Sequence, residues 1–517
     1  MDHETYRDLI GDQRILEMPS SDAVKLLGQV IDFCTDDKCI EGANWAIEIA
    51  KAMVERDLPP DESAVLNYFA ANAWAIVHSR KPAEKRWEWE QEDLARQILY
   101  LRNALLGDGF EQLSSIRQCQ VLVNLGNAMI NVGRFVDAIT YWKRAFEKDS
   151  SFAMAIGNLG MGFLTYGRHL HDQGHAALFI RRAHEELGRA TELQLHPAAH
   201  AAFDKKRKEI EANAADGVLT ADADWDGFSL GDSPEEIKYR RWCLKNVLFI
   251  NPLNDLAARS IAAHDVFGAP SIAVSLGEGP YYAGFYDQMK QEYVSARFLL
   301  WEAGVQEGVH FADRGVRLYN TLDYPAYGLH VEKLKASYRL AYSILDKIVF
   351  FLNHYFALGC PSSRVSFRTI WYEKQDRSNR LLSQLAGKKN LPLRALFWLG
   401  LDLFSDEPGF RDSLEPEGRD IHVIRRHLEH KYLKLHLGDW SGHTQGVGLD
   451  DPLAYSVRTS EFEEKALKLL QLVRSALIYL SLSVYIEEVA RAANRSPDEI
   501  VPGSQLTYWE DEWKAPL

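Results

Sequence analysis

Cysteine is scarce in this 517-residue sequence, which contains only five. Only Cys34 and Cys39 lie close together, and their spacing matches no common pair of zinc ligands. This scarcity argues against a disulfide framework and against a cysteine-based zinc site. It favours a reducing compartment, and we therefore expect the protein to be cytoplasmic.

Net positive charge is also lacking, because 73 acidic residues face 59 basic ones and the formal net charge is −14. Such a chain has no global electrostatic attraction to nucleic acid, so binding to phosphates requires a local basic patch. Membrane signals are missing as well. The sequence begins with the acidic "MDHETYRDLIGD", without the apolar core of a secretory signal, and apolar stretches such as residues 475–486 are too short to span a bilayer. We expect no membrane partner.

Several familiar catalytic motifs are absent. The sequence contains no GxxxxGK[ST], no GxSxG and no HExxH. The "GNLGMG" at residues 157–162 lies within a predicted helix and does not follow a strand, so it is not a phosphate-binding glycine loop. We therefore do not expect an NTPase, a serine hydrolase or a zinc protease, and we expect no cofactor.

Two groups of residues could be taken for metal ligands. Asp222, Asp224 and Asp226 followed by Gly227 match the start of an EF-hand loop, but the twelfth position is Ser233 where a bidentate Glu is needed. We predict a solvated acidic turn. Four histidines at residues 169–184 lack regular ligand spacing, and we expect them to lie on helix surfaces: His169, His171, His175 and His184. No metal site is expected.

Helical periodicity dominates the sequence and alternation with a period of two is almost absent, which predicts a nearly all-α fold. Residues 121–149 resemble a tetratricopeptide (TPR) unit, with small residues where two helices would cross and large ones between repeats: Leu125-Gly126, Met129, Ala138, Trp142 and Ala145. The Leu-Gly pair recurs 34 residues later at Leu159-Gly160, after which the pattern becomes irregular. We predict a TPR-like helical-repeat domain at residues 1–260, whose concave face suits a protein partner or a trigger.

The composition changes after residue 260. Residues 261–330 are rich in Gly, Pro and aromatic residues, interrupted by one strong helix, and we interpret them as a connecting segment. Four long helical segments follow at 331–358, 391–404, 417–436 and 460–494, which predicts a four-helix bundle at residues 331–495 and a C-terminal tail at 496–517.

The third predicted helix of the bundle carries an unusual group of basic residues, in which Arg425 and His430 form an R-x4-H pattern. The pattern alone is weakly specific. Its context adds weight, because the first helix of the bundle places Asp346 and Asn353 within a hydrophobic run. Arg425 and Glu429 are one turn apart, so an ordinary surface ion pair between them is an alternative interpretation.

In this order and context, the segments "YDQMKQEYVSARFLLWEAG", "RLAYSILDKIVFFLNHYF", "VSFRTIWY", "NLPLRALFWLGLDL" and "IRRHLEHKYLKLH" resemble a HEPN domain (higher eukaryotes and prokaryotes nucleotide-binding). The resemblance covers about residues 270–490, and it is greatest to a bacterial subfamily in which the bundle follows helical repeats. It implies metal-independent RNA cleavage that yields a 2′,3′-cyclic phosphate, with the motifs of two chains facing each other in a homodimer. It also suggests a toxin-like effector in bacterial stress response or phage defence.

Applied to this sequence, the resemblance implies that Arg425 and His430 are the catalytic pair. Four further residues would support them: Arg426, Glu429, Asp346 and Asn353. An imidazole can transfer protons near neutral pH, and a guanidinium can hold a phosphate. Residues 419–436 contain five Arg or Lys against two acids, a local basic patch of the kind that RNA binding requires.

One feature departs from the family's pattern. Active members most often have Asn after the arginine, where this chain has Arg426. A nucleotide-binding or inactive HEPN domain, a solvated basic face and a non-catalytic protein-binding scaffold therefore remain open. The neighbouring His422, His427 and His436 are expected to be bystanders.

Overall fold

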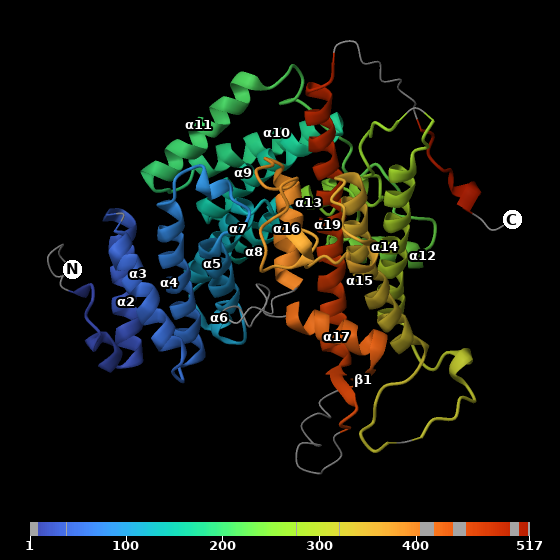
Figure 1. Cartoon of the computed structure of the whole chain (residues 1–517), viewed down its shortest axis with the longest axis horizontal. Coiled ribbons are helices and arrows are strands. Elements are labelled where there is room, and N and C mark those ends of the chain that lie inside the picture. Colours follow the sequence, from blue (N-terminus) through green and yellow to red (C-terminus); the bar gives the residue numbers. More distant parts are fainter. Residues whose placement is uncertain are drawn as a thin grey trace.

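The computed structural model describes residues 9–37, 39–275, 277–319, 321–403, 418–437, 451–496 and 506–514 (Figure 1). It is helical throughout, apart from one small sheet of two strands among the described residues. The predicted all-α fold, with helical repeats before a helical bundle, is confirmed.

The N-terminal half is a row of paired helices that stand side by side in Figure 1. They are α2 (Ser20–Asp37), α3 (Ile40–Val54), α4 (Pro60–Ser79), α5 (Glu92–Asn103), α6 (Gly109–Gln112), α7 (Ser115–Asn131), α8 (Phe135–Lys148), α9 (Ala153–His169), α10 (Gln173–Thr191) and α11 (Pro197–Asn213). Short 3-10 turns occur at Arg14–Glu17, Lys85–Trp87, Ser260–Ala262, Phe311–Asp313, Ser362–Arg364, Glu373–Gln375 and Asp511–Lys514.

Small residues allow these helices to pack closely, as the repeat pattern predicts. A Cβ placed on Gly126 of α7 would lie 2.3 Å from Nε1 of Trp142 on α8. The buried Trp142 indole fills that space and donates a hydrogen bond to the carbonyl oxygen of Val123 at 3.3 Å. In the next hairpin, Gly160 of α9 faces Leu187 of α10 in the same way. The repeated Leu-Gly pair therefore marks two equivalent helix crossings.

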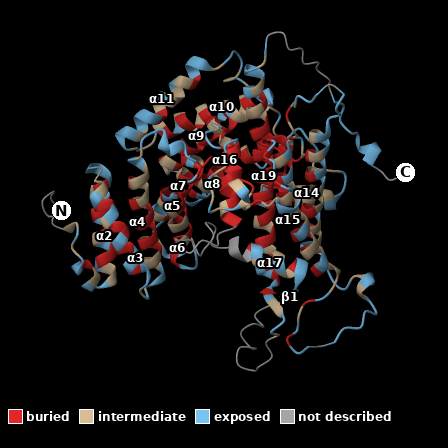
Figure 2. Ribbon diagram, in the orientation of Figure 1, coloured by how far each residue is buried: buried red, intermediate tan, exposed pale blue. Residues whose placement is uncertain are grey.

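The C-terminal half is built around one long central helix. After α12 (Pro234–Lys245) and α13 (Leu253–Leu256), the chain forms α14 (Tyr281–Val305), α15 (Leu329–Tyr355), α16 (Leu391–Leu403), α17 (Gly418–His430) and α19 (Thr459–Ala493). α14 and α15 lie side by side along α19 (Figure 1). Among the described residues, only α19 is long and apolar enough to cross a membrane, and 83% of its most apolar window is buried inside the protein. It is therefore the core helix of this half (Figure 2).

The prediction of a single helix at residues 417–436 is wrong beyond His430. The helix ends there, and β1 (Tyr432–His436) pairs in parallel with β2 (Ala454–Arg458). On the other side of β1, the backbone N–H of Ala326 donates to the carbonyl oxygen of Leu435 at 2.7 Å. The ammonium of buried Lys434 lies 2.7 Å from carboxylates of Asp323 and Asp451. Partners distant in sequence thus hold this segment extended.

Buried ion pairs join the two halves of the chain. Asp402 on α16 accepts two hydrogen bonds from Arg102 on α5, at 2.7 and 2.9 Å, and also pairs with Arg134, the residue before α8. Arg134 in turn contacts Asp137 at 2.8 Å, and Asp137 accepts a hydrogen bond from the Tyr479 hydroxyl of α19 at 2.7 Å. The repeats and the bundle are therefore tied together by charges that neither half satisfies alone.

Candidate active site at the end of helix α17

Helix α17 is fixed to the bundle by one apolar face and two hydrogen bonds from α15. Ile421, Ile424 and Leu428 are buried. The Tyr338 hydroxyl donates to the carbonyl oxygen of Ile421 at 2.9 Å, and Arg339 donates to the carbonyl oxygen of Leu428 at 2.7 Å. Arg339 thereby satisfies one of the last carbonyl groups of α17, which have no partner within the helix. The end of α17 is held firmly.

Arg425 is held by side chains from α15. Its Nη2 donates to Oδ2 of Asp346 at 2.9 Å, and its guanidinium carbon lies 4.4 Å from the centre of the Tyr342 ring. The Arg425 side chain is 35% exposed, so part of it reaches solvent. The ion pair that the structure gives Arg425 is with Asp346, and not with Glu429 as in the surface-pair interpretation.

Burial governs the electrostatics of this pair. It raises the pKa of the Asp346 carboxyl above its ordinary value, a change that the Arg425 guanidinium opposes and the nearby Glu429 carboxylate reinforces. Burial also raises the pKa of the Tyr342 hydroxyl, again against the effect of Arg425. Asp346 and Tyr342 therefore form a partly desolvated binding surface for the Arg425 guanidinium.

His430 is the last residue of α17, and its side chain is exposed. Within the described part of the chain it has no hydrogen bond and no ion pair, and the same holds for the exposed Arg426. Five residues along an α-helix correspond to a rotation of about 140°, so Arg425 and His430 point from different sides of the helix. One copy of the chain does not bring them together on one face.

Asn353 lies two turns beyond Asp346 on α15 and serves the end of that helix. Its Nδ2 donates to the carbonyl oxygen of Cys360 at 2.8 Å, and its Oδ1 accepts from the N–H of Cys360 at 3.0 Å. The structure therefore does not place Asn353 beside Arg425.

Residues 273–487 match the family model described as LA2681-like HEPN. This segment is an LA2681-like HEPN domain. It begins just before α14, ends within α19 and includes the whole of α17, in agreement with the resemblance seen in the sequence. No curated protein matches the chain.

The remaining histidines near the end of α17 have structural partners in the HEPN domain. The His427 ring stacks on Tyr455 with centroids 5.0 Å apart, and its Nδ1 lies 2.8 Å from the carbonyl oxygen of Val423. His436 contacts the carbonyl oxygen of Asp323 at 3.0 Å and the Ser456 hydroxyl at 3.2 Å. The rings of His427 and His436 are thus both engaged in contacts, whereas the His430 ring has no such contact among the described residues.

One contributor to the site escaped the sequence reasoning. Tyr342 precedes Asp346 by four residues, so both side chains lie on one face of α15. That spacing could have indicated the contact. A tyrosine in a hydrophobic run is, however, more often interpreted as a core residue, and Tyr342 is indeed buried. Its role as the surface beneath Arg425 depends on how α17 crosses α15.

The two candidate metal-binding segments lie outside the HEPN domain. Asp222 pairs with Arg181 at 3.2 Å, and Asp226 pairs with Arg259 at 3.0 Å. His184 pairs with Glu211 at 2.8 Å. Among the residues that the structure describes, no group of three or more His, Cys, Asp or Glu could hold a metal ion.

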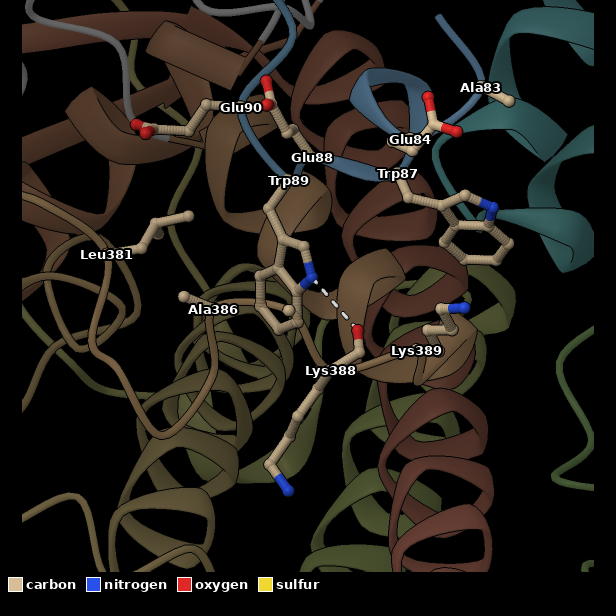
Figure 3. Close-up of a pocket in the computed structure, with 11 residues that line it drawn as sticks. Ala83, Glu84, Trp87, Glu88, Trp89, Glu90, Leu381, Ala386, Lys388 and Lys389 are labelled. Carbon is tan, nitrogen blue, oxygen red and sulfur yellow. Dashed lines mark hydrogen bonds between the residues drawn. The ribbon is translucent and has the colours of Figure 1, made fainter.

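A pocket of about 600 Å³ lies where the repeats meet the HEPN domain, and none of its lining residues belongs to α17. Figure 3 shows the Trp89 indole at its centre, donating to the carbonyl oxygen of Lys388 at 3.5 Å. Its charged lining consists of Glu84, Glu88, Glu90, Lys388 and Lys389. Because Lys388 is already paired with Glu487 at 2.8 Å, the lining offers no surplus of positive charge for a phosphate. The pocket therefore does not compete with α17 as a site for RNA chemistry.

Proposed function

We propose that the HEPN domain is a metal-independent RNA endonuclease whose catalytic residues are Arg425 and His430. One observation carries the proposal. Within a HEPN domain, Arg425 is anchored by Asp346 and Tyr342, whereas the His430 imidazole is exposed at the end of the same helix and has no hydrogen-bond or ion-pair partner among the described residues. An anchored cation and an accessible imidazole are the two parts that phosphodiester cleavage requires.

The chemistry follows from these side chains. The 2′-oxygen of a ribose attacks the adjacent phosphorus, its proton passes to a base, and the bond from phosphorus to the 5′-oxygen breaks as that oxygen gains a proton. An imidazole can transfer protons at neutral pH. The guanidinium stabilises the negative charge that grows on the phosphate oxygens. The products are a 2′,3′-cyclic phosphate and a 5′-hydroxyl.

A homodimer would overcome the separation of Arg425 and His430 on α17. Because the two side chains leave the helix about 140° apart, a site that uses both is more readily assembled from two copies of α17 that face each other. We propose this arrangement together with a role for the repeats at residues 1–260 in holding a protein partner or sensing a trigger. Such a protein would act as a toxin-like effector in bacterial stress response or phage defence.

The test is RNA cleavage by the purified full-length chain in EDTA. We expect 2′,3′-cyclic phosphate ends from the wild type and loss of cleavage in Arg425→Ala and His430→Ala, with His200→Ala, an exposed histidine of α11, as the matched control. Equal RNA integrity with wild type and both variants would refute the nuclease and leave a binding scaffold. Cleavage that requires added metal would refute the mechanism.

A further inference from the structure

Three exposed tyrosines lie on β1, which follows His430, and on the segment that runs alongside β1. Tyr324, Tyr327 and Tyr432, here called the tyrosine strip, are 48%, 45% and 41% exposed. Exposed aromatic side chains are costly to leave in water when they cluster, so such a strip indicates a binding surface. The sequence reasoning assigned it no role.

The backbone brings the strip together. Pro325 forms an antiparallel bridge with His436, and the N–H of Ala326 donates to Leu435. Residues 324–327 therefore run alongside β1. Burial raises the pKa of the Tyr432 hydroxyl, and the neighbouring Tyr327 raises it further, so these two side chains lie close together.

The strip lies next to the proposed catalytic histidine. Tyr432 is two residues beyond His430, so their Cα atoms are separated by about 7 Å at most. A nucleotide whose base rests on Tyr432 would therefore have its phosphate within reach of the end of α17.

Positive charges border the strip next to Tyr432. Arg426 and Lys431 lie at the end of α17, and both are exposed. Neither forms an ion pair within the described residues. Glu429 is the one acidic residue between them in the sequence. In a protein of net charge −14, this local excess of cations favours a polyanion over an apolar protein partner, which would supply no counter-ions.

We propose that the tyrosine strip is a stacking platform for the unpaired bases of single-stranded RNA, with the flanking cations binding its phosphates. Aromatic rings stack on bases only where these are not already paired, so the surface selects single strands over duplexes. This inference deepens the proposed nuclease function, on which it rests, by naming the class of RNA and the side chains that present it to His430.

The test measures RNA binding rather than cleavage. In the full-length His430→Ala background, fluorescence anisotropy compares a labelled single-stranded oligonucleotide with the same sequence as a duplex. We expect Tyr327→Ala/Tyr432→Ala to weaken single-strand binding by about tenfold or more, with little effect on the weaker duplex binding. Tyr327→Phe/Tyr432→Phe should retain affinity, because the rings remain. Tyr508→Ala, at a tyrosine 91% exposed in the C-terminal segment, is the matched control.

The outcomes separate this inference from the nuclease proposal. Unchanged single-strand binding by the alanine pair overturns the inference even if the wild type cleaves RNA. Unchanged binding together with loss of self-association in sedimentation also overturns it, and assigns the strip to a second copy of the chain. If the wild type leaves RNA intact but the alanine pair loses single-strand binding, the platform stands and only the nuclease proposal fails.

Discussion

Asp346 of α15 accepts a hydrogen bond at 2.9 Å from Arg425 of α17, a residue 79 positions further along the chain. The guanidinium of Arg425 is thus oriented from outside its own helix. Burial raises the pKa of the Asp346 carboxyl and so disfavours its charged form. The charged carboxylate that holds Arg425 in position therefore opposes folding.

Replacing Asp346 with Asn should therefore separate activity from stability. We expect RNA cleavage to fall by about tenfold or more, because a charge-assisted hydrogen bond to Arg425 becomes a weaker neutral one. The pKa of Asp346 is raised in the folded protein, so the folded state binds a proton more readily than the unfolded state and ionisation at neutral pH opposes folding. The midpoint of urea unfolding at pH 7 should then be unchanged or higher. Glu292→Gln, which removes the ion pair from Glu292 to Lys347 between α14 and α15, should leave cleavage unaltered.

Asn353→Ala should show the opposite behaviour. Its amide makes two hydrogen bonds to the backbone of Cys360, and their loss should lower the free energy of unfolding by about 1–3 kcal/mol. The rate of cleavage per folded molecule should stay at the wild-type level. A variant of normal stability with impaired cleavage would instead place Asn353 in the site.

The close contact in the first repeat hairpin predicts a sensitive glycine. A methyl group at position 126 would lie 2.3 Å from the Trp142 indole, so Gly126→Ala should destabilise the protein by about 1–3 kcal/mol through overpacking. Gly188→Ala on α10 is a matched control, because its nearest neighbour would be an Arg207 methylene 3.7 Å away. Alanine favours helix there, and stability should be unchanged or slightly greater. Equal unfolding midpoints for the two variants would contradict the predicted packing.

Asp402→Ala should be the most damaging of these substitutions. It leaves the buried guanidiniums of Arg102 and Arg134 without their shared carboxylate, for which a loss of about 3–5 kcal/mol is expected in urea unfolding.

The same group predicts acid sensitivity. Burial alone would raise the pKa of Asp402, but Arg102 and Arg134 lower it to about 2. A lowered pKa contributes stability that is present above the ordinary value of 3.8 and lost as the pH falls toward 2. Wild-type stability should therefore decline over this range, and Asp402→Ala should show a shallower decline. Parallel curves would contradict the assignment.

The sequence predicted those parts of the fold that depend on local spacing. The Leu-Gly pairs at 125–126 and 159–160 correctly marked two helix crossings, because a glycine opposite a large side chain is a property of one hairpin. The same reasoning failed at residues 431–436. The apolar Leu433 and Leu435 resembled the last turn of a helix, whereas their conformation is set by β2 and by the chain near Ala326. Neither partner is local, so spacing could not reveal them.

The candidate site divides in the same way. The R-x4-H pattern and its resemblance to HEPN sequences identified Arg425 and His430, and the hydrophobic run of α15 drew attention to Asp346. The pairing of Asp346 with Arg425 depends on how α15 and α17 cross, and so does the contact between the Tyr342 ring and the Arg425 guanidinium. Asn353 shared the same sequence context, but its amide is directed to Cys360.

The charges shared between α5, the start of α8 and α16 affect how the chain can be divided. A cut near residue 260 would leave Arg102 and Arg134 on one fragment and Asp402 on the other. The buried Asp402 would then lose both guanidiniums, and Arg134 would keep only its contact with Asp137. The fragments would also expose the surfaces that now exclude water from these groups. The repeats and the HEPN domain thus have distinct sequence patterns but depend on each other for folding. A displacement of the repeats would break the ion pairs of Asp402 on α16, and α16 packs against α17.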